Sequence, residues 1–423
     1  MKILVVVLGL FLTTNHSFAE GLMNTMSASE IRGIAESTRE YVREIREFLH
    51  QHPGVRFSPE ETKTLDFIGA KMEDFKLASG RSLYFTPNKG GLVVDVTVNR
   101  SFDRILFRAD VDALPMQEET GLSFSSSKPG VSHACGHDVN AAMLLGAMKL
   151  ICEGKITPKH NLRFVFQRAE ENPITESGGT MLVREGVLED ISRVFALHIF
   201  TENHAPSGQW QTRRGPFMSN SGRVKIEITC DGGHVAVPNE GSNATEIMAD
   251  IIVGMRSFAI TNLGPLEPTS IVPATASAGE PNASNVRPGS AVLWFSFRHL
   301  LSPDKAGKIK ATMKTRIEAI VSAYPDAEVK ITFFDGHPAL RNDPAETQKV
   351  MDLLAATGEK DVVEIDPVFG GEDFAHYLNK VPGTMIFLGA WQEGSGAHHQ
   401  KNFNPNPAIF WKGVFYWLLL AIN

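Results

Sequence analysis

Residues 132–151 read SHACGHDVNAAMLLGAMKLI, in which two histidines and a cysteine stand within five positions, directly before a helical pattern. The chain has only three cysteines, Cys135, Cys152 and Cys230, an odd number that does not suit a disulfide framework. A thiolate that binds a metal ion is occupied, which would explain how a free thiol escapes oxidation. This stretch therefore predicts a helix over 138–152 with metal ligands at its N-terminal end.

Outward from this helix, buried strands alternate with further helices. Helical periodicity covers residues 28–52 and 60–76, and another helix is expected at about 175–187. The expected strands are GLVVDVTV (91–98), RILFRAD (104–110), NLRFVFQ (161–167) and RVFALHIF (193–200). The alternation predicts an α/β domain built on a largely parallel sheet, in which ligands collect at the carboxyl ends of the strands.

The pattern changes after RRGPFMSNSG (213–222). RVKIEITC (223–230) alternates apolar and polar residues, as a half-exposed antiparallel strand does. A helix at 243–262, strands at 269–279 and 290–298, and a helix at 303–323 complete a β-α-β-β-α order. We therefore expect a smaller α+β domain at 215–327, inserted between two pieces of the larger domain at 20–214 and 328–423.

The bulk composition limits the classes of partner. The chain has 423 residues, of which 43% are hydrophobic, so two domains with substantial cores are expected. The net charge of −7 gives no basic surplus, and no nucleic-acid partner is expected.

The N-terminus reads MKILVVVLGLFLTTNHSFAEG and has the layout of a secretory signal: Lys2, an apolar run and a small residue at position 19. We expect residues 1–19 to be removed and the mature chain to be exported, either secreted or periplasmic. An uncleaved anchor or a buried N-terminal helix is the alternative. No other segment is long and apolar enough to suggest a membrane span after cleavage, and the apolar C-terminal stretch is interrupted by Lys412.

Four groups of potential metal ligands stand at the ends of expected strands or at the start of a helix. Taken alone, each residue has an ordinary explanation: a satisfied histidine, a solvated glutamate or a small buried cysteine. In a parallel sheet, however, all four groups can converge at one edge. The candidate ligands are Cys135, His137, Glu171, His198 and His398.

This donor set suits Zn²⁺, Mn²⁺, Co²⁺ or a similar divalent ion. Because five ligands exceed one tetrahedral site, two ions are plausible, bridged by a thiolate, a carboxylate or a water. Glu171 can bind metal, while its neighbour Glu170 can take a proton from a metal-held water and deliver it to a leaving amine.

The chain also carries a series of sparse motifs in one order. Together they resemble the binuclear metallopeptidase family that contains aminoacylases, hippurate hydrolases and the hydrolases of auxin–amino acid conjugates, from about residue 30 to 420. The motifs are RADVDALP (108–115), HACGHD (133–138), FQRAEE (166–171), GGTMLVREGVL (178–188), LHI (197–199), GGHVAVP (232–238), SNV (284–286), GGEDF (370–374) and AHH (397–399).

The resemblance implies a zinc-peptidase-like catalytic domain with a binuclear site, and an inserted domain that serves as lid and dimerisation module. It assigns the five candidate ligands as named and makes Glu170 the general base. It implies that His234 reaches the active site of the other subunit of a homodimer and helps hold the substrate carbonyl or its oxyanion. Asp110 would orient a metal ligand, although a strand-terminal acid without a role is the alternative.

The chain departs from the pattern around the site. Val139 and Asn140 stand where the family usually has Gly-His, Arg168 stands where proline is common, and Gln400 follows the histidine pair in place of proline. The segment ENPITES (171–177) is not the usual Gly-rich stretch. Arg168 either meets an acidic substrate or pairs with a local glutamate, and we favour the second option.

These features predict a metal-dependent amidohydrolase that splits an N-acyl amino acid or a related small amide into a carboxylic acid and an amino acid. An exported dipeptidase or carboxypeptidase of the same family is the alternative. A non-catalytic exported binding protein on the same scaffold is the alternative from another class.

Overall fold

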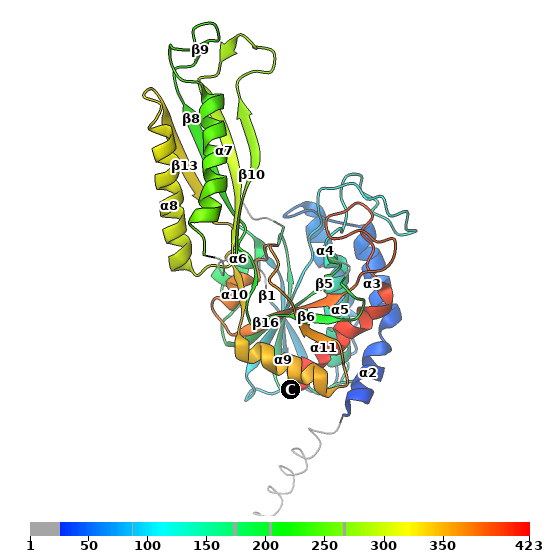
Figure 1. Ribbon diagram of the computed structural model, residues 1–423. Coiled ribbons are helices and arrows are strands. Elements are labelled where there is room, and N and C mark those ends of the chain that lie inside the picture. The colour runs from blue at the N-terminus through cyan, green and yellow to red at the C-terminus, as the bar shows by residue number, and fades with distance from the viewer. Residues whose placement is uncertain (1–25, 87, 172–175, 203–204, 265–267) are drawn as a thin grey trace, which may run out of the picture.

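The computed structural model describes residues 26–86, 88–171, 176–202, 205–264 and 268–423, so the expected signal segment 1–19 lies outside the described residues. Within these ranges the strands expected near the HACGHD motif join one eight-stranded sheet (Figure 1). In spatial order its strands are β1 (Ser82–Thr86), β2 (Gly91–Thr97), β4 (Asn161–Gln167), β3 (Arg104–Asp110), β5 (Ile191–Phe200), β16 (Gly383–Gly389), β6 (Trp210–Thr212) and β15 (Val362–Glu364).

The four central strands β4, β3, β5 and β16 run parallel, as the alternation of strands and helices predicts. The two edges are mixed: β1 and β2 are antiparallel, β2 is antiparallel to β4, and β6 is antiparallel to β16 but parallel to β15. All four central strands therefore present their carboxyl ends at the same edge of the sheet.

Helices cover both faces of this sheet. One face packs against α2 (Ala28–Glu36), α3 (Arg39–Gln51), α4 (Pro59–Glu73), α5 (His137–Cys152), α9 (Pro344–Ala356) and, after the 3₁₀ turn η2 (Pro407–Ile409), α11 (Phe410–Ile422). The other face packs against α6 (Gly178–Arg184) and α10 (Ala375–Leu378).

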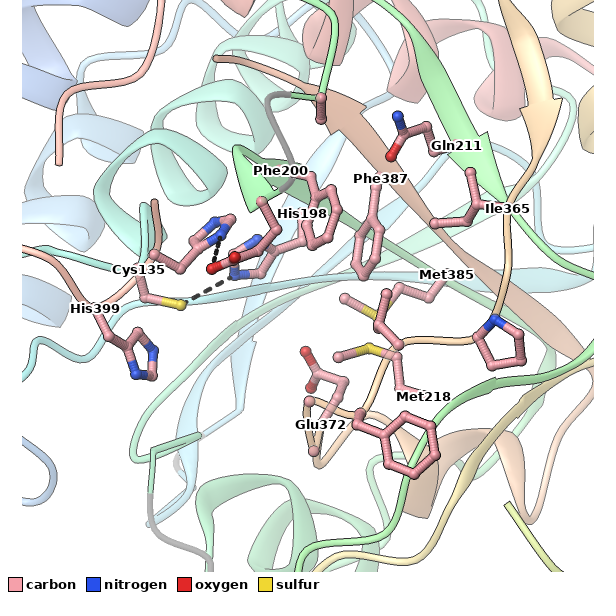
Figure 2. Close-up of a pocket in the computed structure, with 18 of the residues that line it drawn as sticks. Cys135, His198, Phe200, Gln211, Met218, Ile365, Glu372, Met385, Phe387 and His399 are labelled. Atoms are coloured by element: carbon pink, nitrogen blue, oxygen red, sulfur yellow. Dashed lines mark hydrogen bonds and ion pairs between the residues drawn. The ribbon is translucent and has the colours of Figure 1, made fainter. Parts of the chain in front are cut away.

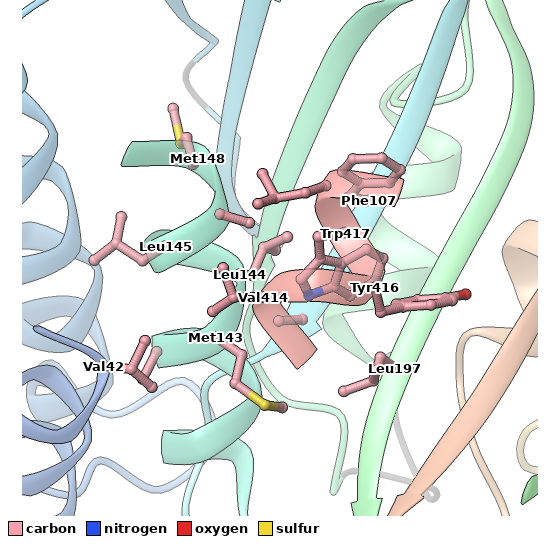
Figure 3. Packing of buried hydrophobic residues seen from close by; sticks show 14 of the residues in the cluster. Val42, Phe107, Met143, Leu144, Leu145, Met148, Leu197, Val414, Tyr416 and Trp417 are labelled. Atoms are coloured by element: carbon pink, nitrogen blue, oxygen red, sulfur yellow. The ribbon is translucent and has the colours of Figure 1, made fainter. Parts of the chain in front are cut away.

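Helix α5 is the centre of the larger core. It packs against α3 and α11, and every residue in it except Lys149 is buried. Figure 3 shows Met143 and Leu144 of α5 in one cluster with Val42 of α3 and Val414 of α11. The helix expected at 138–152 is thus covered on nearly all sides, and its first turn lies beside the site.

The inserted domain is a second, antiparallel sheet with two helices on one face, α7 (Ala244–Thr261) and α8 (Pro303–Val321). In spatial order its strands are β10 (Thr269–Ala278), β12 (Ser290–His299), β8 (Gly222–Thr229) and β13 (Glu328–Phe334). Two short ladders complete the fold: β9 (Gly233–His234) with β11 (Val286–Arg287), and β7 (Gly215–Met218) with β14 (Leu340–Asn342).

The sequence-based boundaries of this domain need correction at both ends. Strand β13, which follows residue 327, pairs with β8 in the small sheet and is not part of the larger domain. At the other end, Phe217 of β7 is fully buried in the core of the larger domain. An alternating pattern predicts a strand but does not identify the sheet that the strand joins.

The small domain extends away from the larger one, with β9 at its far end (Figure 1). Among the residues that the structure describes, no helix combines the length and apolar character needed to cross a bilayer.

Candidate active site

The carboxyl ends of the central strands open into a pocket of about 840 Å³. One side of it carries thiol, imidazole and carboxylate groups, and the other side carries aromatic rings and methionines (Figure 2). The pocket brings together Cys135, Glu170, Glu171, His198, His398 and His399, which come from four separate segments of the chain.

Cys135 and His137 are set by the turn into α5. Gly136 between them has φ of 89°, in the left-handed region, where a β-carbon would meet Ile199 Cδ1 at 2.4 Å. Because only glycine adopts this conformation without strain or collision, the HACGHD sequence can turn sharply into the helix. The turn leaves the cysteine on the pocket wall and the histidine in the first turn of α5.

Among the described residues, four groups of side chains have the mutual spacing of metal ligands, with their ligand atoms within 4.8 Å of one another, and three of these groups contain Cys135 or His137. Cys135 belongs to two of these groups, and Cys135 Sγ lies 3.7 Å from His198 Nε2. These three groups are Cys135, His137 and His198; Cys135, Glu171 and His399; and His137, Glu170 and Glu171. The predicted ligands Cys135, His137, Glu171 and His198 are therefore brought together.

The fifth predicted ligand, His398, lies beside the cluster, with its ring centroid 5.5 Å from that of His198. Its neighbour His399 is closer to the acid of the cluster, with Nε2 at 3.0 Å from Glu171 Oε1. His398 Nε2 instead lies 3.1 Å from the carbonyl oxygen of Ile199, and its Nδ1 faces Thr201 Oγ1 at 3.4 Å. The sequence offered two adjacent histidines, and only the loop conformation decides which one points at the thiol.

His137 is oriented by a residue that the sequence analysis did not single out. Its Nδ1 lies 2.9 Å from the backbone oxygen of Asp112 and 3.1 Å from Asp112 Oδ1. The other nitrogen, Nε2, is buried without a hydrogen-bond partner among the described residues, 3.8 Å from Asp110 Oδ2. A buried, unbonded imidazole nitrogen beside a thiol and carboxylates is the arrangement expected of a metal ligand.

Asp110 is held by a dense set of bonds. It accepts from Arg108 Nη1 at 2.7 Å and from Asn140 Nδ2 at 2.9 Å. Burial works against its charge, but His137 and Arg108 hold the pKa of this carboxyl below its usual range. Asn140 also accepts from the backbone N–H of Ile199 at 3.1 Å, so this departure from the family pattern ties the α5 turn to β5.

Glu170 lies against two further acids, Glu372 and Asp373 of the GGEDF motif. Burial raises its pKa well above the usual range, and the charges of Glu372 and Glu171 raise it further. The buried Arg108 partly balances these acids, with Nη2 at 2.7 Å from Asp373 Oδ1 and 3.1 Å from Glu372 Oε1. The GGEDF motif was visible in the sequence, but its contact with Glu170 was not.

Arg168 has the structural role that we favoured. Its Nε donates to Glu61 Oε2 at 2.8 Å, and the same carboxylate accepts from the backbone N–H of Ala169 at 2.7 Å. The pair holds the segment before Glu170, where Ala169 has a φ of 51°. The other departures are also local: Gln400 accepts from the backbone of Ala397 at 3.1 Å, and Val139 is fully buried in the core.

His234 lies in β9, at the end of the small domain far from this pocket (Figure 1). It is exposed and does not line the pocket of its own chain. A role for His234 in catalysis therefore requires a second copy of the chain.

The donor atoms of this cluster suit a divalent metal ion. One thiol, three imidazoles and two carboxylates converge, and this mixture suits Zn²⁺ and similar ions. Burial raises the pKa of the Cys135 thiol, despite the nearby His137, so a cation would be needed to hold it as a thiolate.

The profile of peptidase family M20/M25/M40 matches residues 106–423. The chain belongs to this family. It is 30% identical to thermostable carboxypeptidase 1 of Saccharolobus solfataricus, over 93% of this chain and 98% of that protein. It is 31% identical to N-acetyl-L-cysteine deacetylase of Bacillus subtilis, over 88% of this chain and 85% of that protein.

A solved M20 structure also matches. It is a dinuclear metal-binding peptidase from Bacillus subtilis, with a TM-score of 0.76, 25% identity, and coverage of 92% of this chain and 98% of that one. The M20 fold, with its catalytic domain and inserted domain, is therefore that of this chain. As a member of the family, the protein is a metal-dependent hydrolase of amide or peptide bonds that acts on small molecules.

Proposed function

We propose that this protein hydrolyses the amide bond of N-acyl amino acids or related small amides, releasing a carboxylic acid and an amino acid. The observation that carries the proposal is the position of Glu170, which lines the pocket beside the ligand cluster. A relative named as an N-acetyl-L-cysteine deacetylase supports this substrate class.

We propose two divalent ions, Zn²⁺, Mn²⁺ or Co²⁺, in each subunit. Cys135 belongs to two of the ligand groups and would help to hold the metal. The remaining ligands would be His137, Glu171, His198 and His399. Bound divalent ions polarise a carbonyl oxygen and make water acidic enough to attack at neutral pH.

Glu170 performs the proton transfers. The positive charge of bound ions would favour its ionised form over the raised pKa of the ion-free site. In that form it takes a proton from the attacking water as the water oxygen bonds to the amide carbon. When the C–N bond breaks, Glu170 returns that proton to the leaving nitrogen, which departs as an amine. Arg108, Glu372 and Asp373 form the buried surroundings of this carboxyl group, with Arg108 paired to both acids.

Arg298 is suited to bind the carboxylate of the amino acid. It lines the pocket, and its Nη1 is 3.4 Å from the backbone oxygen of Asn220. Within the described part of the chain it forms no ion pair with an acid, and burial together with Arg223 lowers its pKa. A half-buried cation with no acidic partner attracts an anionic substrate group.

A carboxypeptidase or dipeptidase is the second candidate, favoured by the relative named thermostable carboxypeptidase 1. It would use the same residues on a substrate with a free amino group. A panel of N-acetyl amino acids, N-benzoyl amino acids and dipeptides, tested on protein loaded separately with each metal, distinguishes the two. If neither the acylated nor the free compounds are cleaved with any metal, the hydrolase proposal fails, and binding without turnover supports a binding protein.

Glu170→Gln tests the proton-transfer role. We expect this variant to retain its metal content and lose turnover by at least about a hundredfold. Glu171→Gln is the matched control, because it removes a metal ligand and should lower metal content as well as turnover. Full activity in Glu170→Gln would refute the assigned base.

We also propose that the protein is exported after removal of residues 1–19, which the composition of that segment supports. N-terminal mass analysis of the protein recovered from its host tests this cleavage.

We propose a homodimer formed through the inserted domain, supported by the exposed apolar Val253, Ile260 and Val272 on that domain. Light scattering of the full chain tests the dimer, and a monomeric mass at micromolar concentration would contradict it.

A further inference from the structure

The pocket has a continuous apolar wall, which we define as Phe200, Met218, Ile365, Met385 and Phe387. Figure 2 shows these five side chains on the side of the pocket away from Cys135 and His399. Phe387 and Phe200 are stacked, with ring centroids 4.4 Å apart and planes 8° apart. The apolar wall is one side of the same pocket, and the hydrolytic step does not use it.

The apolar wall begins directly beside the reacting centre. Phe387 of β16 is the partner of His198 in the β16–β5 ladder, and their ring centroids are 6.5 Å apart. A group attached to either side of the scissile amide would therefore reach the wall without crossing solvent.

The wall is rigid as well as apolar. Phe200, Met385 and Phe387 stand on strands of the large sheet, and Met218 stands on β7, which is paired with β14. A further ring, Phe217, lies behind Phe387 at a centroid distance of 4.6 Å. A preformed apolar surface gains affinity from an apolar ligand without first having to be ordered.

The acidic neighbour of Ile365 points away from the wall into solvent, since the Asp366 side chain is fully exposed. We propose that the apolar wall binds a large apolar group of the substrate, a phenyl ring or a branched aliphatic chain. This inference rests on the proposed amide hydrolysis and selects among its substrates.

The test measures binding to the inactive Glu170→Gln variant loaded with metal, so it does not depend on turnover. The probes are N-acetylglycine, N-benzoylglycine and N-acetylphenylalanine. We expect at least one of the two aromatic compounds to bind about tenfold tighter than N-acetylglycine, because its ring leaves water. Tighter binding of N-benzoylglycine assigns the wall to the acyl group, and tighter binding of N-acetylphenylalanine assigns it to the amino-acid side chain.

Met218→Gln in this background keeps the length of the side chain but makes it polar. It should remove most of the aromatic preference, while N-acetylglycine binds as before. Met26→Gln, at an exposed position remote from the pocket, is the matched control. Equal binding of all three probes, or an aromatic preference unchanged by Met218→Gln, would overturn the proposal. If the parent chain cleaves none of the probes but the aromatic preference in binding is present, the result counts against the proposed function and not against the role of the wall.

A different observation concerns the tip of the inserted domain. The guanidinium of Arg287 is buried, and within the described residues it forms no ion pair with an acid. Its two terminal nitrogens donate instead to backbone carbonyl groups of one loop, 232–241. The accepting residues are Gly232, Val237, Pro238, Glu240 and Gly241.

This loop carries His234, and the ladder that pairs Arg287 with Gly233 also pairs Val286 with His234. His234 Nδ1 accepts from the backbone N–H of Ala236 at 3.0 Å. In a neutral imidazole this bond leaves the proton on Nε2, so the exposed ring offers a hydrogen-bond donor. We propose that Arg287 is a positioning residue, which fixes the loop and thereby His234 Nε2–H. The role rests on the proposed dimer, in which His234 serves the other subunit.

A double-mutant cycle tests this coupling. We expect Arg287→Gln and His234→Ala each to lower kcat about tenfold or more, and the double variant to be no worse than His234→Ala. Multiplied losses in the double variant, or full activity of either single variant, would overturn the proposal. Hydrogen exchange provides a readout independent of activity: Arg287→Gln should speed exchange in the loop 232–241 and leave β8 and β12 protected.

Discussion

The two adjacent histidines near the C-terminus make different contacts because their rings point in different directions. His399 has a φ of 60°, and its N–H donates to the backbone oxygen of Ala134 at 2.8 Å. This bond joins the C-terminal loop to the HACGHD segment and directs the His399 ring towards Cys135 and Glu171. Hydrogen bonds to those two residues raise the pKa of His399 to about 10 in the metal-free protein.

We expect His399→Ala to weaken metal binding by more than about tenfold, since it removes a ligand. His398→Ala is the matched control and should retain most of the metal, because its ring bonds to Ile199 and Thr201. Metal content after dialysis against a weak chelator measures both. A larger metal loss in His398→Ala than in His399→Ala would restore the sequence-based assignment.

A second residue-level prediction concerns Glu118 in the loop before α5. Partial burial opposes its charge, but hydrogen bonds from His50, Thr120 and Ser126 lower its pKa to about 2. Because this pKa is below that of the unfolded chain, the unfolded state binds more protons at low pH. The stabilisation is therefore complete above about pH 4.5 and is lost as the pH falls towards 2.

Glu118→Gln should accordingly flatten the fall in the free energy of unfolding between pH 5 and pH 3. Urea unfolding at several pH values measures the slope. Glu119→Gln removes an exposed ion pair with Lys401 and should leave the slope as in the parent chain. If the free energy of unfolding of Glu118→Gln depends on pH as in the parent chain, the hydrogen bonds to Glu118 do not stabilise its ionised form.

At the level of elements, the turn into α5 controls the site. The helix itself follows from a long apolar stretch, but its first residue is a candidate ligand, so the direction of entry matters. Gly136 allows that direction because it lies at a positive φ against Ile199 and Phe403. The site therefore depends on a backbone conformation as much as on ligand identity.

Gly136→Ala should destabilise the metal-free protein by roughly 2 kcal/mol or more, from backbone strain and the collision with Ile199. Gly130→Ala is the matched control: Gly130 also has a positive φ, of 74°, but a β-carbon there would meet nothing within 4 Å. Gly130→Ala should lower the free energy of unfolding by about 1 kcal/mol, from backbone strain alone. Chemical denaturation compares the two, and equal losses would exclude the collision.

At the level of the whole molecule, the ligand cluster joins segments that are far apart in the chain. The helix turn at Cys135, the strand end at Glu171, β5 at His198 and the C-terminal loop at His399 all meet there. Metal that binds the folded state alone therefore stabilises the whole larger domain.

Chelation should lower the thermal midpoint and re-addition of metal should restore it. A free ion concentration a hundred times Kd stabilises the folded state by about 2.7 kcal/mol.

In the same samples Cys135, which is partly exposed, should react with thiol reagents only after chelation. The buried Cys152 and Cys230 serve as internal controls. Equal labelling of Cys135 with and without metal would contradict its role as a ligand.

The sequence by itself determined the local elements and most of the ligand types. The expected strand at 104–110 coincides with β3, and α5 begins one residue before the expected helix, because period and burial are local properties. Cys135, His137, Glu171 and His198 were recognisable because they end strands or begin a helix at one edge of the sheet.

Only the tertiary structure decided which long-range partners meet. It placed β13 in the small sheet, directed His399 towards Glu171, and brought Asp112 to His137 and the GGEDF acids to Glu170. These outcomes depend on strand pairing and loop direction between residues far apart in the chain, and a local hydrophobic pattern carries no information about either.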